Sequence, residues 1–125
     1  MPQNNAEQKI QEIKKFLEWL KQDNPVPVAK IEMIYTNSKH LRRIGINATL
    51  RPVGPYEASI EVAIGRPTND VLRSVAHEWM HVIQLYQQHI PFEKIKLHKE
   101  LEAEGFAVNA IMKYLGISFA QFRHV

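Results

Sequence analysis

The sequence predicts an α+β domain: an N-terminal helix, a small, mostly antiparallel three-stranded sheet, and then two long helices. Three observations carry this prediction. Apolar residues recur at helical spacing near the start and again through the last third of the chain. Short β-branched segments lie between these regions. The length of 125 residues suits one hydrophobic core, so residues 1–125 are expected to form a single domain.

The first half supplies one amphipathic helix and the sheet. The helix is expected over residues 8–20 and is stopped by Asn24 and Pro25. Strands are expected over residues 29–36, 44–50 and 58–64. The two prolines and the glycine of RPVGPYE favour a hairpin connection between the last two strands.

The second half is mostly helical. One helix should run from about residue 69 to residue 88, because a residue before Pro91 avoids helical angles. Another should cover residues 95–115, with Gly116 as its left-handed C-cap. Ser118 and Gln121 have capping-box spacing, which favours a short terminal turn.

Composition narrows the classes of function. Hydrophobic residues make up 45% and charged residues 23%, which is typical of a soluble globular domain. There is no cysteine, so any metal site must use His, Asp and Glu. The polar N-terminus resembles no secretory signal and no apolar stretch could span a membrane, so a cytoplasmic protein without membrane contact is expected.

The formal net charge of +3 gives weak support for nucleic-acid binding. The densest basic clusters are KHLRR at residues 39–43 and KIKLHK at residues 94–99. A solvated surface is the favoured interpretation of both clusters. The sequence does not indicate an oligomeric state.

The stretch SVAHEWMHVIQ, residues 74–84, places three polar groups in an apolar helix. His77 and His81 lie one turn apart on one face, so two imidazoles can converge on one ion at about 2.0–2.1 Å. Glu78 points about 100° away around the axis, where it could reach a water on that ion. HEWMH therefore fits the H-E-x-x-H pattern of metallohydrolases. The alternative is a core helix whose histidines bond to backbone carbonyls.

A catalytic zinc site needs a third protein ligand, and the next predicted helix offers acidic candidates. In ELEAEGFA, residues 100–107, Glu100 and Glu104 share a face with two alanines that would allow close helix packing. Glu102 lies on the far side and is expected to face solvent. An exposed acidic helix start is the alternative, but its position eighteen residues after HEWMH (residues 82–99 intervene) favours a joint metal site.

These two motifs, HEWMH and ELEAEGFA, resemble those of gluzincin metallopeptidases. The small size and the element order are most similar to minigluzincins and the ImmA/IrrE-type peptidase domain, a minimal zincin core. The resemblance implies that Glu100 is the third zinc ligand beside His77 and His81. Where that family has an Asp or Asn that orients a ligand histidine, this chain has the longer Glu104. Glu104 could orient His77 in the same way or could itself compete for the metal, and Glu100 is the favoured ligand.

The resemblance implies a zinc-dependent peptidase. Zn²⁺ would acidify a bound water, and Glu78 would act as general base. It further implies a peptide or protein substrate that adds as a strand along residues 58–64, from Ala58 to Ile64, taken as the edge of the sheet. A hypothesis for regulation places the C-terminal SFAQFRHV across the cleft. The alternative function is a DNA-associated or regulatory binding protein with a zincin fold and a structural metal.

Overall fold

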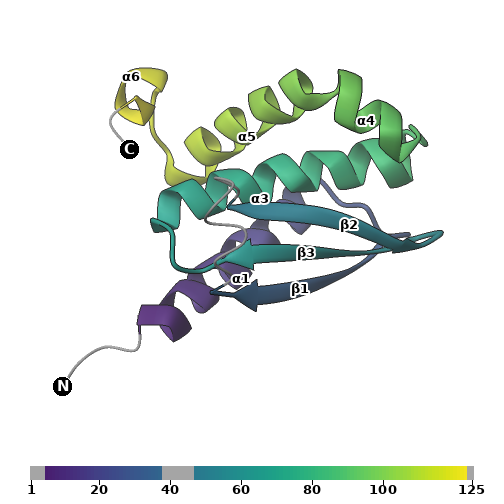
Figure 1. Ribbon diagram of the computed structural model, residues 1–125. Coiled ribbons are helices and arrows are strands. Elements are labelled where there is room, and N and C mark those ends of the chain that lie inside the picture. The colour runs from purple at the N-terminus through teal and green to yellow at the C-terminus, as the bar shows by residue number, and fades with distance from the viewer. Residues whose placement is uncertain (1–4, 38–46, 124–125) are drawn as a thin grey trace.

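The computed structural model confirms the α+β class and describes residues 5–37 and 47–123. In Figure 1, α1 and α3 cover one face of a three-stranded sheet, and α5 lies alongside α3. The elements in chain order are α1 (Asn5–Asp23), β1 (Lys30–Thr36), β2 (Ala48–Gly54), β3 (Glu57–Ala63), α3 (Thr68–Val82), the π-helical η1 (Ile83–Gln87), α4 (Phe92–His98), α5 (Glu100–Leu115) and α6 (Phe119–Phe122).

The amphipathic pattern of the first helix produces α1, which extends beyond the predicted range at both ends. Ile13, Phe16 and Leu20 are buried, so one face of α1 belongs to the hydrophobic core. Phe16 also stacks on Trp19 of the same helix, with 5.9 Å between the two ring centroids. Burial of this apolar face, rather than helix propensity, holds α1 against α3 and the sheet.

The sheet is mixed rather than mostly antiparallel. Its strand order is β1-β3-β2, with β1 parallel to β3 and β2 antiparallel to β3. The chain therefore crosses from one edge to the other before the predicted β2–β3 hairpin returns it to the centre. Side chains at alternate positions, including Leu50, Ile60 and Val62, are buried against the helices, as the period of two requires.

The expected edge position of residues 58–64 is wrong. β3 has hydrogen-bonded neighbours on both sides, so it is the central strand and cannot accept a further one. The alternation of its side chains shows only which face is buried, because strand order depends on long-range pairing. β1 and β2 form the two edges of the sheet.

The second strand ends later than expected. Residues 44–46 of its predicted range lie outside the described part of the chain, and β2 runs from Ala48 through Pro52 to Gly54. The prolines of RPVGPYE favour a turn, but an edge strand tolerates a proline wherever its missing N–H would face away from the partner strand. The hairpin turn is therefore shorter than RPVGPYE suggested.

The last third of the chain follows the predicted spans with two differences. The helix expected over residues 69–88 is α3 followed by the π-helical turn η1. The helix expected over residues 95–115 is divided at Lys99, whose φ of −118° and ψ of 9° leave the helical region, so α4 and α5 are separate. Gly116 has the predicted left-handed conformation, and Ser118 has the predicted capping box of α6.

No helix within residues 5–37 and 47–123 combines the length and the apolar character needed to cross a bilayer.

Candidate metal centre

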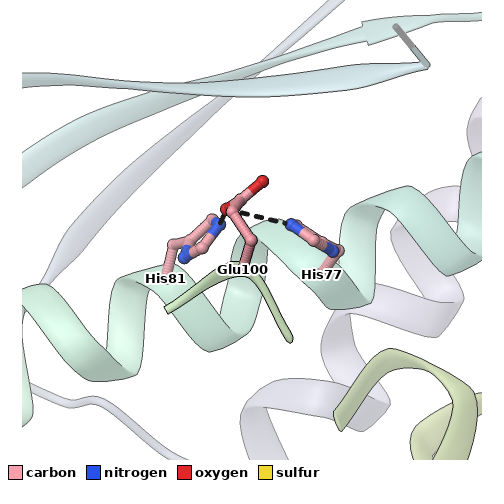
Figure 2. Close-up of side chains that lie close together, drawn as sticks. All are labelled: His77, His81 and Glu100. Carbon is pink, nitrogen blue, oxygen red and sulfur yellow. Dashed lines mark hydrogen bonds and ion pairs between the residues drawn. The ribbon is translucent and has the colours of Figure 1, made fainter. Parts of the chain in front are cut away.

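His77 and His81 lie on α3 with their imidazole rings turned toward the same point (Figure 2). Their ring centroids are 4.8 Å apart. His81 is completely buried, and His77 is partly exposed. The i, i+4 spacing thus brings the two rings together as the sequence predicted.

Glu100, the first residue of α5, completes the cluster. Its Oε1 atom lies 2.6 Å from His81 Nε2 and 3.4 Å from His77 Nε2. The break at Lys99 lets α5 start opposite these histidines, and Ala103 and Ala107 are fully buried one and two turns later. One ligand atom from each of the three residues lies within 4.8 Å of the others, so the group could hold a metal ion.

The contact between His81 and Glu100 is compatible with a bound cation. His81 Nε2 is buried and makes no hydrogen bond, although a carboxylate oxygen lies 2.6 Å away. Burial lowers the pKa of His81 and favours the neutral ring. The other ring nitrogen, Nδ1, lies 2.8 Å from Gln84 Oε1 and donates its proton to that oxygen. In the neutral ring, Nε2 then carries an electron pair. Two electron-pair donors this close are stabilised when a cation lies between them.

The distances suit a small divalent ion with nitrogen and oxygen ligands. Ligand atoms about 2.0–2.1 Å from a tetrahedral ion lie about 3.3 Å apart. The 3.4 Å between Glu100 Oε1 and His77 Nε2 matches this separation, and the 2.6 Å to His81 is shorter. The Glu100 side chain is 52% exposed, so it can rotate and lengthen its distance to His81 when an ion binds.

Glu104 contacts His77 from the side opposite the cluster. Its Oε2 atom lies 3.1 Å from His77 Nδ1, and Arg73 donates hydrogen bonds to its Oε1. Burial alone would raise the pKa of Glu104, but the hydrogen bonds and charges of Arg73 and His77 outweigh burial and hold it below its usual value. Glu104 is thus a carboxylate that contacts His77 alone, while Glu100 approaches both histidines.

Glu78 is the buried carboxyl group of the site. It is 6% exposed, and its Oε2 atom has no hydrogen-bond partner. Burial raises its pKa to about 7, against the opposing charges of Lys96 and His77 and a hydrogen bond with the Leu50 backbone. A group that titrates near neutral pH in a cavity is typical of acid–base chemistry.

The cluster and Glu78 open into a cavity of about 540 Å³. The cavity lies between the start of β2 and helices α3, α4 and α5. Its lining residues are Asn47, Ala48, Thr49, Asp70, Arg73, Ser74, His77, Glu78, Lys96, Glu100 and Glu104. Water and a small part of an extended ligand can therefore reach the cluster.

Two other expectations concern residues near the site. Glu102 is exposed as predicted, but its Oε1 atom accepts a hydrogen bond from Gln84 Nε2 at 2.6 Å. Residues 118–123 do not line the cavity themselves, but the Phe122 ring packs against cavity-lining Arg73, whose Cζ lies 5.5 Å from the ring centroid, so the C-terminal hypothesis stays a prediction. The basic cluster at residues 39–43 lies outside the described residues.

Sequence reasoning missed Arg73, Gln84 and Lys96. Gln84 had a usable signal: an amide three residues after His81 on an apolar helix must find a partner when it is buried. Arg73 lies one turn before His77 on the same face of the helix, where a charged side chain needs a partner of opposite charge. Its partner in the structure is Glu104. Lys96 had no signal of its own among the other basic residues of its segment.

Fold and site together define an α+β protein with a candidate His–His–Glu metal site. Comparison of the chain with protein-family models, with curated proteins and with solved structures finds no match.

Proposed function

We propose that this chain is a zinc-dependent metallopeptidase of the gluzincin type. His77, His81 and Glu100 would hold the ion, and Glu78 would be the general base. One observation carries the proposal: the buried Glu78 carboxyl, with an unpartnered oxygen, lies beside the three candidate ligands and faces the same cavity. A purely structural metal site has no need of a buried carboxyl group at this position.

The ligand number supports catalysis over a structural role. Structural zinc sites have four protein ligands, and catalytic sites have three and an open position. The group formed by the described residues has three members and opens to the cavity. Zinc bound there supplies a Lewis acid that lowers the pKa of a water and polarises the scissile carbonyl.

Glu78 is suited to move protons in this reaction. The nearby charge of a divalent cation favours the ionised form of its carboxyl, which accepts a proton from the attacking water. The protonated carboxyl then delivers that proton to the nitrogen of the leaving amine. Lys96, which lines the same cavity, adds a positive charge near the reacting groups.

The outer edge of β2 is the proposed binding surface for an extended peptide. Asn47, Ala48 and Thr49 line the cavity, and β2 has no strand on its outer side within the described chain. The Asn47 carbonyl accepts a hydrogen bond from the Ala63 N–H, so by alternation the backbone groups of residues 48, 50 and 52 point away from β3. These outward groups are available for strand addition in place of the central strand first considered.

The decisive experiment combines metal analysis with cleavage of casein or a peptide library. We expect wild-type protein to take up about one equivalent of zinc and to lose cleavage when a chelator removes it. Glu78→Gln should keep the zinc and lose cleavage by about 10²–10⁴-fold, the usual contribution of a general base. Glu12→Gln, at an exposed position of α1, is the matched control and should retain both.

Two results would contradict the proposal. Equal cleavage by wild type and Glu78→Gln would remove Glu78 from the reaction. A protein that holds zinc without cleaving any substrate, and that shifts duplex DNA in a salt-dependent manner, would favour the DNA-associated alternative.

A further inference from the structure

Gln84 is a completely buried amide in the π-helical turn η1, three residues after His81. Its backbone is also held in place, because its carbonyl accepts a hydrogen bond of 2.9 Å from the Ile90 N–H. A buried amide without partners is strongly destabilising, so the contacts of its side chain are informative. Short π-helical segments within helices frequently occur at functional sites.

The partners of the amide fix its orientation. One end of the side chain lies 2.6 Å from Glu102 Oε1 and 3.5 Å from the Lys99 carbonyl oxygen. A carboxylate and a carbonyl only accept hydrogen bonds, so the Gln84 NH₂ group must point toward them. The amide oxygen then points the other way, 2.8 Å from His81 Nδ1.

The orientation of the amide determines the tautomer of His81. Because the Gln84 oxygen can only accept, His81 Nδ1 must carry the proton and donate it. The other ring nitrogen, Nε2, then holds an electron pair and lies 2.6 Å from Glu100 Oε1, at the candidate metal position. A neutral imidazole with this distribution of protons is the form that ligates a metal.

We propose that Gln84 and Glu102 form a positioning pair that holds His81 as the Nδ1–H tautomer, with Nε2 aimed at the metal position. This inference rests on the metal-binding part of the proposed function and assigns roles to two residues outside the cluster. The Glu102 carboxylate accepts a hydrogen bond from the Gln84 NH₂ group. This bond polarises the amide and so strengthens the hydrogen bond between the amide oxygen and His81. The two histidines are therefore oriented differently. His77 contacts the Glu104 carboxylate directly, whereas His81 contacts the Gln84 amide, which in turn is bonded to the Glu102 carboxylate.

The test uses variants of the full chain that remove one link at a time. Gln84→Met keeps the length of the side chain and removes both hydrogen bonds. Glu102→Ala changes an exposed side chain and removes the remote charge. Gln87→Met, an exposed position in the same π-helical turn, is the matched control.

Two measurements separate positioning from general stability. The ¹⁵N chemical shifts of the His81 ring in zinc-free protein report its tautomer directly. Competition with a chelator gives the zinc affinity. We expect wild type and Gln87→Met to show the Nδ1–H tautomer, and Gln84→Met to lose that preference and bind zinc about 10–100-fold more weakly. Glu102→Ala should shift both readings in the same direction by less.

A wild-type His81 ring protonated at Nε2, or variants with unchanged tautomer and zinc affinity, would overturn the proposal. If Gln84→Met does not fold, Glu102→Ala decides, because an exposed substitution should not disturb the core. If wild-type protein binds no zinc, the proposed function fails, whereas the tautomer of zinc-free protein still tests the positioning pair.

Discussion

Replacing Glu78 by Gln should stabilise the metal-free protein at alkaline pH. In the folded chain, burial raises the pKa of this carboxyl from 4.5 to about 7. A carboxyl whose pKa is raised by folding contributes stability below about pH 4.5, and this stability is lost as the pH rises through about 7. Above that range the folded protein must hold a buried negative charge that the unfolded chain exposes to water.

The magnitude follows from the size of the change in pKa. A rise from 4.5 to about 7, at about 1.4 kcal/mol per pKa unit, corresponds to about 3 kcal/mol. Because glutamine is neutral at every pH, Glu78→Gln should be more stable than wild type by about 3 kcal/mol near pH 8.5. Near pH 5 the folded wild-type carboxyl is protonated, and the difference should fall below about 1 kcal/mol.

The assay is urea denaturation in the presence of a chelator, monitored by tryptophan fluorescence, to which the buried Trp79 contributes. Other groups titrate over the same range, so the quantity of interest is the difference between variant and wild type at each pH. Glu12→Gln is the control and should show no pH-dependent difference. A Glu78→Gln variant without added stability near pH 8.5, or with an advantage that persists on acidification, would refute the reasoning.

Three further predictions concern the surroundings of the site. Glu104→Ala should leave the protein folded but weaken zinc binding about 10–100-fold, measured by chelator competition, because His77 loses the carboxylate that orients it. Gly116→Ala should lower the free energy of unfolding by about 1–2 kcal/mol in urea, since the φ of 67° is strained for any residue with a Cβ; an unchanged value would contradict this. A chain ending before Ser118 should bind zinc and cleave substrate like the full chain, because residues 118–123 touch the cavity only through the Phe122 ring on Arg73; faster cleavage would instead support the hypothesis that the C-terminal segment covers the cleft.

The helical part of the fold and most of the candidate cluster could be predicted because both depend on local periodicity. The i, i+4 spacing of His77 and His81 fixes their common face once the segment is helical. The same spacing placed Glu100 and Glu104 on one face of the next helix, and both reach the histidines.

The arrangement of the sheet could not be predicted in the same way. Alternation of apolar and polar residues shows which side of a strand is buried. The central position of β3, between β1 and β2, depends instead on long-range pairing. The position of Pro52 within β2 could not be predicted either, because a proline has the same local signal in a turn and on an exposed strand edge. The partnership of Gln84 with Glu102 depends on a π-helical turn and on the separation of α4 from α5, and neither feature has a clear sequence signature.

Pro52 also bears on the solubility of the chain in crowded conditions. An uncovered sheet edge offers a template on which any extended segment can assemble, including the same strand of another copy. At Pro52 the outward row of β2 has a carbonyl but no N–H, so the hydrogen-bonded ladder of a stacked second copy would be interrupted there. The proposed peptide would pair with the end of β2 beside the cavity, whereas at the far end Pro52 would oppose fibre-like growth.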